Sequence, residues 1–184
     1  EGKEYLVLGK PAPTDAPKGQ VEVVEVFWYS CPHCNAFEPR LEAWVKQLPK
    51  DVSFRRAPVS FRADFEPQQR LYFVLEALNL VDTLHAKVFY AIHVERKNLT
   101  TKDAIATWIA TQGVEKAKFL ETYDSFSVAS KARRASQLQD AYEVAGVPSI
   151  GVGGRFYTDG QQAGSMERVL QTTDFLVAEL RKGR

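Results

Sequence analysis

The two cysteines of this chain constrain its fold and its chemistry more than any other residues. Cys31 and Cys34 are separated only by Pro32 and His33, and the 184-residue sequence contains no other cysteine. They follow the apolar, β-branched run 21–29 and precede a helical pattern. A Cys-x-x-Cys pair between a strand and a helix is typical of a thiol–disulfide redox site. Any disulfide within one chain must therefore join Cys31 to Cys34.

The residues around the cysteines predict a β-α-β unit. Apolar residues occupy both parities of the run 21–29, which indicates a strand buried on both faces. Pro32 suits the first turn of a helix, where its missing N–H costs nothing. Apolar residues then recur at spacings of three and four until Pro49, which predicts an amphipathic helix. A second strand over 52–56 completes a unit of about 40 residues.

The middle of the chain, residues 67–146, has a helical period almost throughout. Apolar stripes predict several helices, one of which is expected to begin at a capping pair formed by Thr100 and Asp103. The last of these helices is expected to run over 127–145 and to stop at Gly146. Such stripes are far more often packed core than part of a cofactor site, so we expect no cofactor.

A β signal returns near the end of the chain. Strands are predicted at 149–152 and 155–157, on either side of a Gly153-Gly154 turn typical of a hairpin. Ser165 is expected to cap a final helix.

The order of these elements predicts an α/β fold in two parts. A β-rich domain is expected from residues 1–64 and 146–184, with a helical domain over 65–145 inserted between them. A chain of 184 residues is long enough for one domain that carries such an insertion.

The composition excludes several classes of protein. The formal net charge is +1, from 24 basic and 23 acidic residues, whereas nucleic-acid binding needs a clustered basic excess. The sequence contains no run of about 18 apolar residues, so no transmembrane helix is expected. The sequence begins at Glu1 without an apolar signal core, which fits either a mature exported protein or a shortened sequence.

Cys31 is the predicted nucleophile. At the start of a helix its thiolate would lie among unpaired backbone N–H groups and at the positive end of the helix dipole. Cys34 lies one turn later, within bridging distance of Cys31. We expect Cys31 to be the exposed, attacking sulfur and Cys34 to be the shielded, resolving one. His33, protonated or donating a hydrogen bond, would stabilise the thiolate further and make the disulfide more oxidising.

Glu25 is a charged residue inside a strand that is otherwise apolar. It is either a strand-end charge that reaches water or a buried carboxylate, and a buried carboxylate needs a partner. Arg56 shares the parity of the apolar Val52 and Phe54 and should therefore point inward, whereas Arg55 should not. We predict an ion pair between Glu25 and Arg56.

Two features also have an ordinary explanation. A cysteine pair can bind zinc, but a closed structural site needs four ligands, and His85 and His93 lie in the helical segment, so no metal is expected. Val147-Pro148 follows a predicted helix, and X-Pro bonds in folded proteins are cis in only about 5–6% of cases. On the residues alone, Pro148 is more simply a trans proline that ends a helix.

The segment 27–34, with Pro-His between the cysteines, resembles the active-site segment of the DsbA family of periplasmic thiol:disulfide oxidoreductases. Glu25 matches the family's buried glutamate by spacing, and Val147-Pro148 matches its active-site cis-proline and the residue before it. The resemblance covers nearly the whole chain and implies a thioredoxin fold with an inserted all-helical domain. Arg56 stands where the best-known members carry lysine, and because arginine cannot lose its proton, a proton-shuttling role for this pair is not expected.

The resemblance also implies a function. The protein would be an enzyme that donates the Cys31–Cys34 disulfide to newly exported, cysteine-containing proteins in a Gram-negative periplasm, after removal of a signal peptide. A DsbB-type membrane quinone reductase would reoxidise it. The residues implied in catalysis are Cys31, Pro32, His33, Cys34 and Pro148. Substrate would dock its backbone along the Val147 edge, and we expect a monomer.

Two rival functions use the same residues. A disulfide isomerase or reductase could share the fold, but periplasmic isomerases carry an added N-terminal dimerisation domain, and Cys31 is too near the start of the sequence to leave room for one. A metal- or peptide-binding module could use the cysteine pair only as a ligand.

Overall fold

The computed structural model describes residues 1–183, whose contacts form two compact units. The first unit consists of residues 1–27, 36–57 and 138 onward, and the second of residues 28–35 and 58–137. The boundaries expected from the sequence, at 64 and 145, fall several residues later in the chain. By its contacts, the cysteine loop belongs to the second unit, together with the helical segment 58–137.

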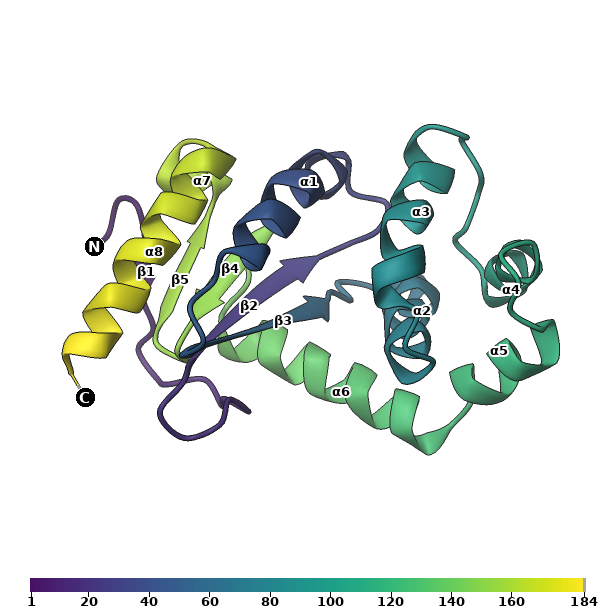
Figure 1. The fold of residues 1–184 in the computed structure, drawn as a ribbon, viewed down its shortest axis with the longest axis horizontal. Coiled ribbons are helices and arrows are strands. Elements are labelled where there is room, and N and C mark those ends of the chain that lie inside the picture. The colour runs from purple at the N-terminus through teal and green to yellow at the C-terminus, as the bar shows by residue number, and fades with distance from the viewer. Residues whose placement is uncertain (184) are drawn as a thin grey trace. The chain divides into compact units, whose positions relative to one another are not determined.

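The first unit is built on a mixed β-sheet. Its strands are β1 (Leu6–Val7), β2 (Val21–Phe27), β3 (Val52–Pro58), β4 (Ser149–Val152) and β5 (Phe156–Asp159), in the spatial order β1-β5-β4-β2-β3. β4 pairs antiparallel with both β2 and β5, and β1 pairs antiparallel with β5. β2 and β3 run in the same direction (Figure 1), as a helical crossover between neighbouring strands allows. The predicted β-α-β unit and the α/β class are confirmed.

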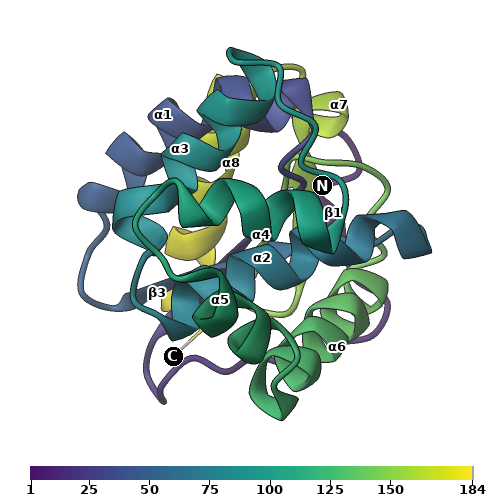
Figure 2. The same cartoon turned by 90° about the vertical axis from the view of Figure 1, so that its right-hand side faces the viewer.

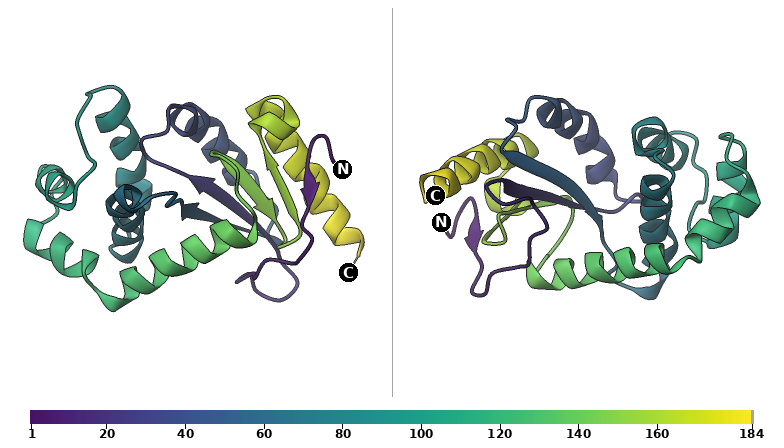
Figure 3. Two further views of the ribbon diagram at one scale, coloured as in Figure 1. Left: turned by 180° about the vertical axis from the view of Figure 1, so that it is seen from behind. Right: turned by 60° about the horizontal axis from the view of Figure 1, so that its bottom comes forward.

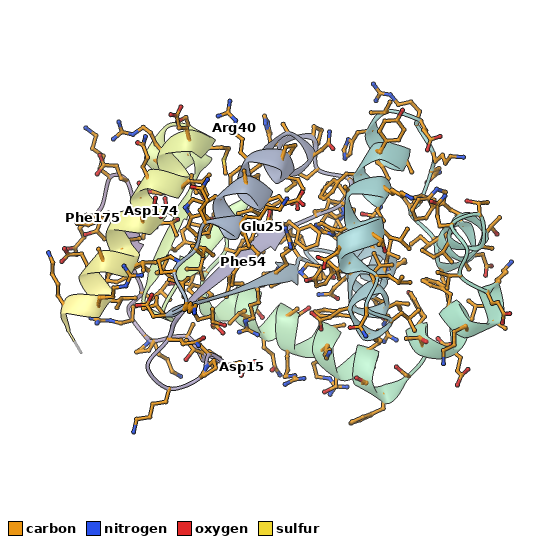
Figure 4. All side chains as sticks on the ribbon, in the orientation of Figure 1. Asp15, Glu25, Arg40, Phe54, Asp174 and Phe175 are labelled. Carbon is orange, nitrogen blue, oxygen red and sulfur yellow. The ribbon has the colours of Figure 1, made fainter. Side chains whose placement is uncertain are left out.

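Two helices cover one face of this sheet (Figure 3): α1 (Pro32–Lys46) and α8 (Met166–Lys182), with the short α7 (Gly160–Ala163) between β5 and α8. The core between them comes from alternate strand residues and one stripe of each helix: Val21, Val23, Phe37, Leu41, Ile150, Val152, Ala163, Val169, Leu176 and Val177. Trp44 Nε1 of α1 donates to Asp174 Oδ1 of α8 at 2.9 Å, and Asp174 is labelled in Figure 4. Ser165 caps α8 as predicted, because its side chain accepts from Arg168 N.

The β4–β5 hairpin turns where the glycine pair predicts. Gly153 and Gly154 have φ of 61° and 71°, in the left-handed region that favours glycine. Arg155 N–H donates to Val152 O at 3.0 Å and closes the turn. β5 starts at Phe156 and extends to Asp159, whose side chain caps α7.

The second unit is helical. It contains a 3₁₀ turn (Ala63–Phe65), α2 (Glu66–Ala77), α3 (Val81–His93), α4 (Lys102–Ala110), α5 (Lys116–Tyr123) and the first part of α6 (Phe126–Ala141). α2 contacts α3, α4 and α5 (Figure 2), so the apolar stripes found in the sequence face one another. Residues 65–137 contain no strand. No helix within residues 1–183 combines the length and the apolar character needed to cross a bilayer.

Two predicted helix ends are wrong. α4 is capped by Thr101, whose side chain accepts from Ala104 N, whereas Thr100 donates to Asn98 Oδ1 at 2.6 Å. α6 ends at Ala141 rather than near Gly146. Glu143 adopts a left-handed φ of 53°, and Val144 N–H donates back to Gln139 O at 3.1 Å. This bonding pattern closes a helix and leaves no role for Gly146 as the terminator.

Candidate active site

The cysteine loop begins where β2 ends. The backbone turns over residues 28–31, since Cys31 N–H donates to Trp28 O at 3.1 Å. Asn35 N–H then donates to Cys31 O at 3.0 Å, which makes Cys31 the residue that immediately precedes the first turn of α1. Pro32 is the first helical residue, as predicted.

The surroundings of Cys31 favour its thiolate. The side chain of Cys34 hydrogen-bonds to Cys31 and is the largest influence that lowers the pKa of the Cys31 thiol. Burial opposes it, and the backbone N–H groups of Cys34 and His33 add to the lowering, with Cys34 N lying 3.2 Å from Cys31 Sγ. The net result is a pKa of about 7, against an ordinary 9.0. Donors that the first helical turn leaves unpaired therefore act on the sulfur.

The exposures of the two cysteines differ less than the sequence suggests. Cys31 is 6% exposed and Cys34 is fully buried. Cys31 is thus the more accessible residue of the pair, but it is buried, so the prediction of an exposed Cys31 is wrong. His33 acts on Cys31 through its backbone N–H, and its side chain is exposed. A role for the His33 imidazole stays a prediction.

The turn before Cys31 is held by side chains of α2 and α3. The hydroxyl of Tyr29 shares a 2.7 Å hydrogen bond with His85 Nδ1, and His93 Nε2 donates to Tyr29 O at 2.7 Å. Gln68 Nε2 donates to Ser30 Oγ at 2.8 Å. The sequence-based prediction missed these residues. The eight-residue spacing of the histidines on one helix face was the available signal.

Glu25 belongs to a buried cluster of three charged side chains in the first unit. Arg56 Nε lies 3.4 Å from Glu25 Oε1, so the predicted ion pair is present. Arg56 Nη2 also donates to Glu38 Oε1 of α1 at 2.6 Å. Figure 4 labels Glu25, together with Phe54 of β3. Glu38 was missed, although it follows Cys34 by four residues and so shares its helix face.

The peptide bond between Val147 and Pro148 is cis, as the family resemblance implies and the residues alone do not. β4 begins at the next residue, Ser149. Tyr157 holds the backbone before Val147 through hydrogen bonds. Its hydroxyl accepts from Ala145 N at 3.4 Å and donates to Asp159 Oδ2 at 2.6 Å. Burial, followed by the hydrogen bond with Asp159, raises the pKa of Tyr157.

A metal centre has no support in the part of the chain that the structure describes. No group of three or more His, Cys, Asp or Glu side chains within residues 1–183 is placed to hold an ion.

These features define a class. A β-α-β unit with a two-cysteine loop at its helix start, followed by a hairpin that begins after a cis-proline, is typical of dithiol–disulfide oxidoreductases of the thioredoxin fold.

Comparison with known proteins gives the family. The model of the DSBA-like thioredoxin domain matches residues 22–171, so this chain belongs to that family. It is 45% identical to the thiol:disulfide interchange protein DsbA of Bordetella parapertussis over 181 residues, which cover 98% of this chain and 86% of the relative. It is 41% identical to the protein of that name from Burkholderia cepacia over 179 residues, which cover 97% of this chain and 84% of the relative.

Solved structures of DsbA proteins have the same fold as this chain. The crystal structure of Pseudomonas aeruginosa DsbA superimposes with a TM-score of 0.93 at 41% identity, covering 99% of this chain and 94% of that one. The oxidoreductase DsbA from Xylella fastidiosa superimposes with a TM-score of 0.91 at 31% identity. The protein is therefore a protein disulfide oxidoreductase with a thioredoxin fold and an inserted helical domain.

Proposed function

We propose that this protein donates the Cys31–Cys34 disulfide to newly exported, cysteine-containing proteins in a Gram-negative periplasm. The observation that carries the proposal is the set of donors on Cys31 Sγ, namely the Cys34 side chain and the backbone N–H groups of Cys34 and His33, which lower the pKa of this thiol below its ordinary value. A stabilised thiolate favours the reduced form of the enzyme and makes its disulfide a stronger oxidant. The names of the relatives, which are thiol:disulfide interchange proteins, support disulfide exchange as the activity.

The thiol–disulfide exchange proceeds in two steps. A substrate thiolate attacks Cys31 Sγ of the disulfide, the Cys31–Cys34 bond breaks, and Cys34 leaves with the electron pair and takes up a proton. A second substrate thiolate then attacks the substrate sulfur of the mixed disulfide, and Cys31 leaves as a thiolate. The substrate loses two electrons and gains a disulfide, while the enzyme ends as a dithiol. The Cys34 side chain, followed by the amides of Cys34 and His33, favours the second step, because these donors stabilise the departing thiolate.

The other residues have supporting roles in this proposal. Val147 offers its main chain to an extended substrate segment in the manner of an added strand, with cis-Pro148 ending the segment before β4. Glu25 and Arg56 modulate the enzyme as part of a buried ion cluster, without shuttling protons, because arginine keeps its charge. A DsbB-type membrane quinone reductase accepts the two electrons when the enzyme, acting as a monomer, is reoxidised.

Trapping of mixed disulfides tests the assignment of Cys31 as the cysteine that forms the mixed disulfide with the substrate. Cys34→Ser, incubated with an oxidised cysteine peptide, should accumulate a mixed disulfide through Cys31, because the resolving thiol is absent. Cys31→Ser is the matched control and should accumulate none. Equal trapping by both variants would contradict the assignment.

An equilibrium titration against glutathione tests the direction of electron flow. An oxidase should have a disulfide that glutathione reduces readily, with a reduction potential well above that of the reductase thioredoxin, about −270 mV. A potential near the thioredoxin value would instead favour a reductase of the same fold.

A further inference from the structure

Residues 28–31 set the position of the reactive sulfur. Trp28 O accepts the N–H of Cys31, so a shift of the intervening residues moves Cys31 directly. The exchange chemistry described above uses the cysteines and the amides of α1, but it assigns no role to the side chains that hold this turn. Those side chains come from α2 and α3, and all of them belong to the same compact unit as the cysteine loop.

Tyr29 is anchored at its hydroxyl. It is 1% exposed, and its hydrogen bond with His85 Nδ1, at 2.7 Å, is buried. Aromatic rings enclose the imidazole of His85, since the centroids of Tyr72 and Phe89 lie 5.6 Å and 5.3 Å from its own. A hydrogen bond in such surroundings has little competition from water and fixes the phenol ring of Tyr29.

Tyr29 is also anchored at its backbone. A carbonyl oxygen only accepts, so the 2.7 Å contact between His93 Nε2 and Tyr29 O requires a proton on Nε2. The ring of Phe89 stacks on His93 with an interplanar angle of 25° and so orients the imidazole. The next residue, Ser30, accepts from Gln68 Nε2, which also donates to Leu99 O at 2.8 Å. The side chain and backbone of the turn are therefore held at three points.

We propose that Tyr29, His85 and His93 are positioning residues, which fix this turn so that Cys31 Sγ stays within hydrogen-bonding distance of the amides of His33 and Cys34. These amides stabilise the thiolate only while the sulfur lies against them, because hydrogen bonds weaken steeply with distance and angle. α3 thus sets the reactivity of a cysteine more than 50 residues before it in the sequence. The inference rests on the proposed function, in which Cys31 is the cysteine that forms the mixed disulfide with the substrate.

The pKa of Cys31, measured from the pH dependence of alkylation of the reduced protein, tests this inference. Tyr29→Phe keeps the ring and removes the hydroxyl, and His93→Phe removes the donor to Tyr29 O. Each should raise the pKa of Cys31 by about half a unit to one unit, the equivalent of one hydrogen bond. His93→Gln should restore the wild-type pKa, because its amide can donate to the same carbonyl. Tyr90→Phe is the matched control, since Tyr90 lies on α3 but is 56% exposed.

Denaturant melts of the same variants separate positioning from general stability. Lower stability with an unchanged pKa of Cys31 in Tyr29→Phe and His93→Phe would overturn the inference. If His93→Phe does not fold, Tyr29→Phe decides the question by the same measurement. A wild-type Cys31 with an ordinary pKa would instead refute the proposed function, so the two failures are distinguishable.

Discussion

Replacing Arg56 with methionine should destabilise the protein severely. Methionine keeps much of the apolar stem and removes the charge that Glu25 and Glu38 share. The Glu25 and Glu38 side chains are buried, with exposures of 0% and 8%, and the Arg56 side chain is partly buried, with an exposure of 14%. Breaking a buried ion pair by removing one partner costs about 3–5 kcal/mol, because the remaining charge is left in a poor solvent. That is a large fraction of a total stability of about 5–15 kcal/mol.

Urea denaturation of the reduced protein at neutral pH measures this cost. Arg168→Met is the matched control: its partner is Glu4, the two side chains are 56% and 41% exposed, and its expected cost is about 0–1 kcal/mol. Adding Glu25→Gln should recover part of the deficit of Arg56→Met, because it removes one of the two negative charges that lose Arg56 as a partner. A cost for Arg56→Met no larger than that of the control would refute the reasoning, since it would mean that water screens the cluster.

Three further predictions concern single features. The thiolate of Cys31, with its pKa lowered from 9.0 to about 7, should add about 0.4 kcal/mol to the stability of the reduced form at pH 7 and about 2.3 kcal/mol at pH 9. The contribution is fully present above the unfolded pKa and is lost as pH falls through 7, so a reduced-minus-oxidised difference that is constant between pH 6 and pH 9 in denaturant melts would contradict it. Gly151→Ala should cost about 1–3 kcal/mol in thermal melts, because its Cβ would lie 2.5 Å from the ring of the buried Tyr142; a wild-type melting temperature would show that the ring moves aside freely. Ser165→Ala should cost about 1 kcal/mol through loss of the cap on α8, while Ser165→Asp should not, and equal stability of the two variants would show that the cap is unimportant.

Local patterns were sufficient for much of this molecule. The cysteine spacing between a strand and a helix predicted the redox loop, and Pro32 marked the helix start. Strand parity paired Glu25 with Arg56, because side chains alternate between the faces of a sheet with a period of two. The Gly153-Gly154 turn was equally local, since few other residues adopt a left-handed backbone. The cis state of Pro148 came from the family resemblance and not from the residues themselves.

The sequence by itself therefore determined the elements, their order and the reactive pair, all of which depend on residues within a few positions of one another. Only the tertiary structure showed that Glu38 joins the Glu25–Arg56 pair, and that His85 and His93 hold the turn before Cys31. These contacts link residues up to 64 positions apart. They depend on how helices and strands pack together. The spacing of residues in the sequence shows which side chains share one face of a helix, but it does not show which other element that face contacts. The end of α6 was missed for a related reason, because a chain turn at Glu143, rather than the nearest glycine, closes the helix.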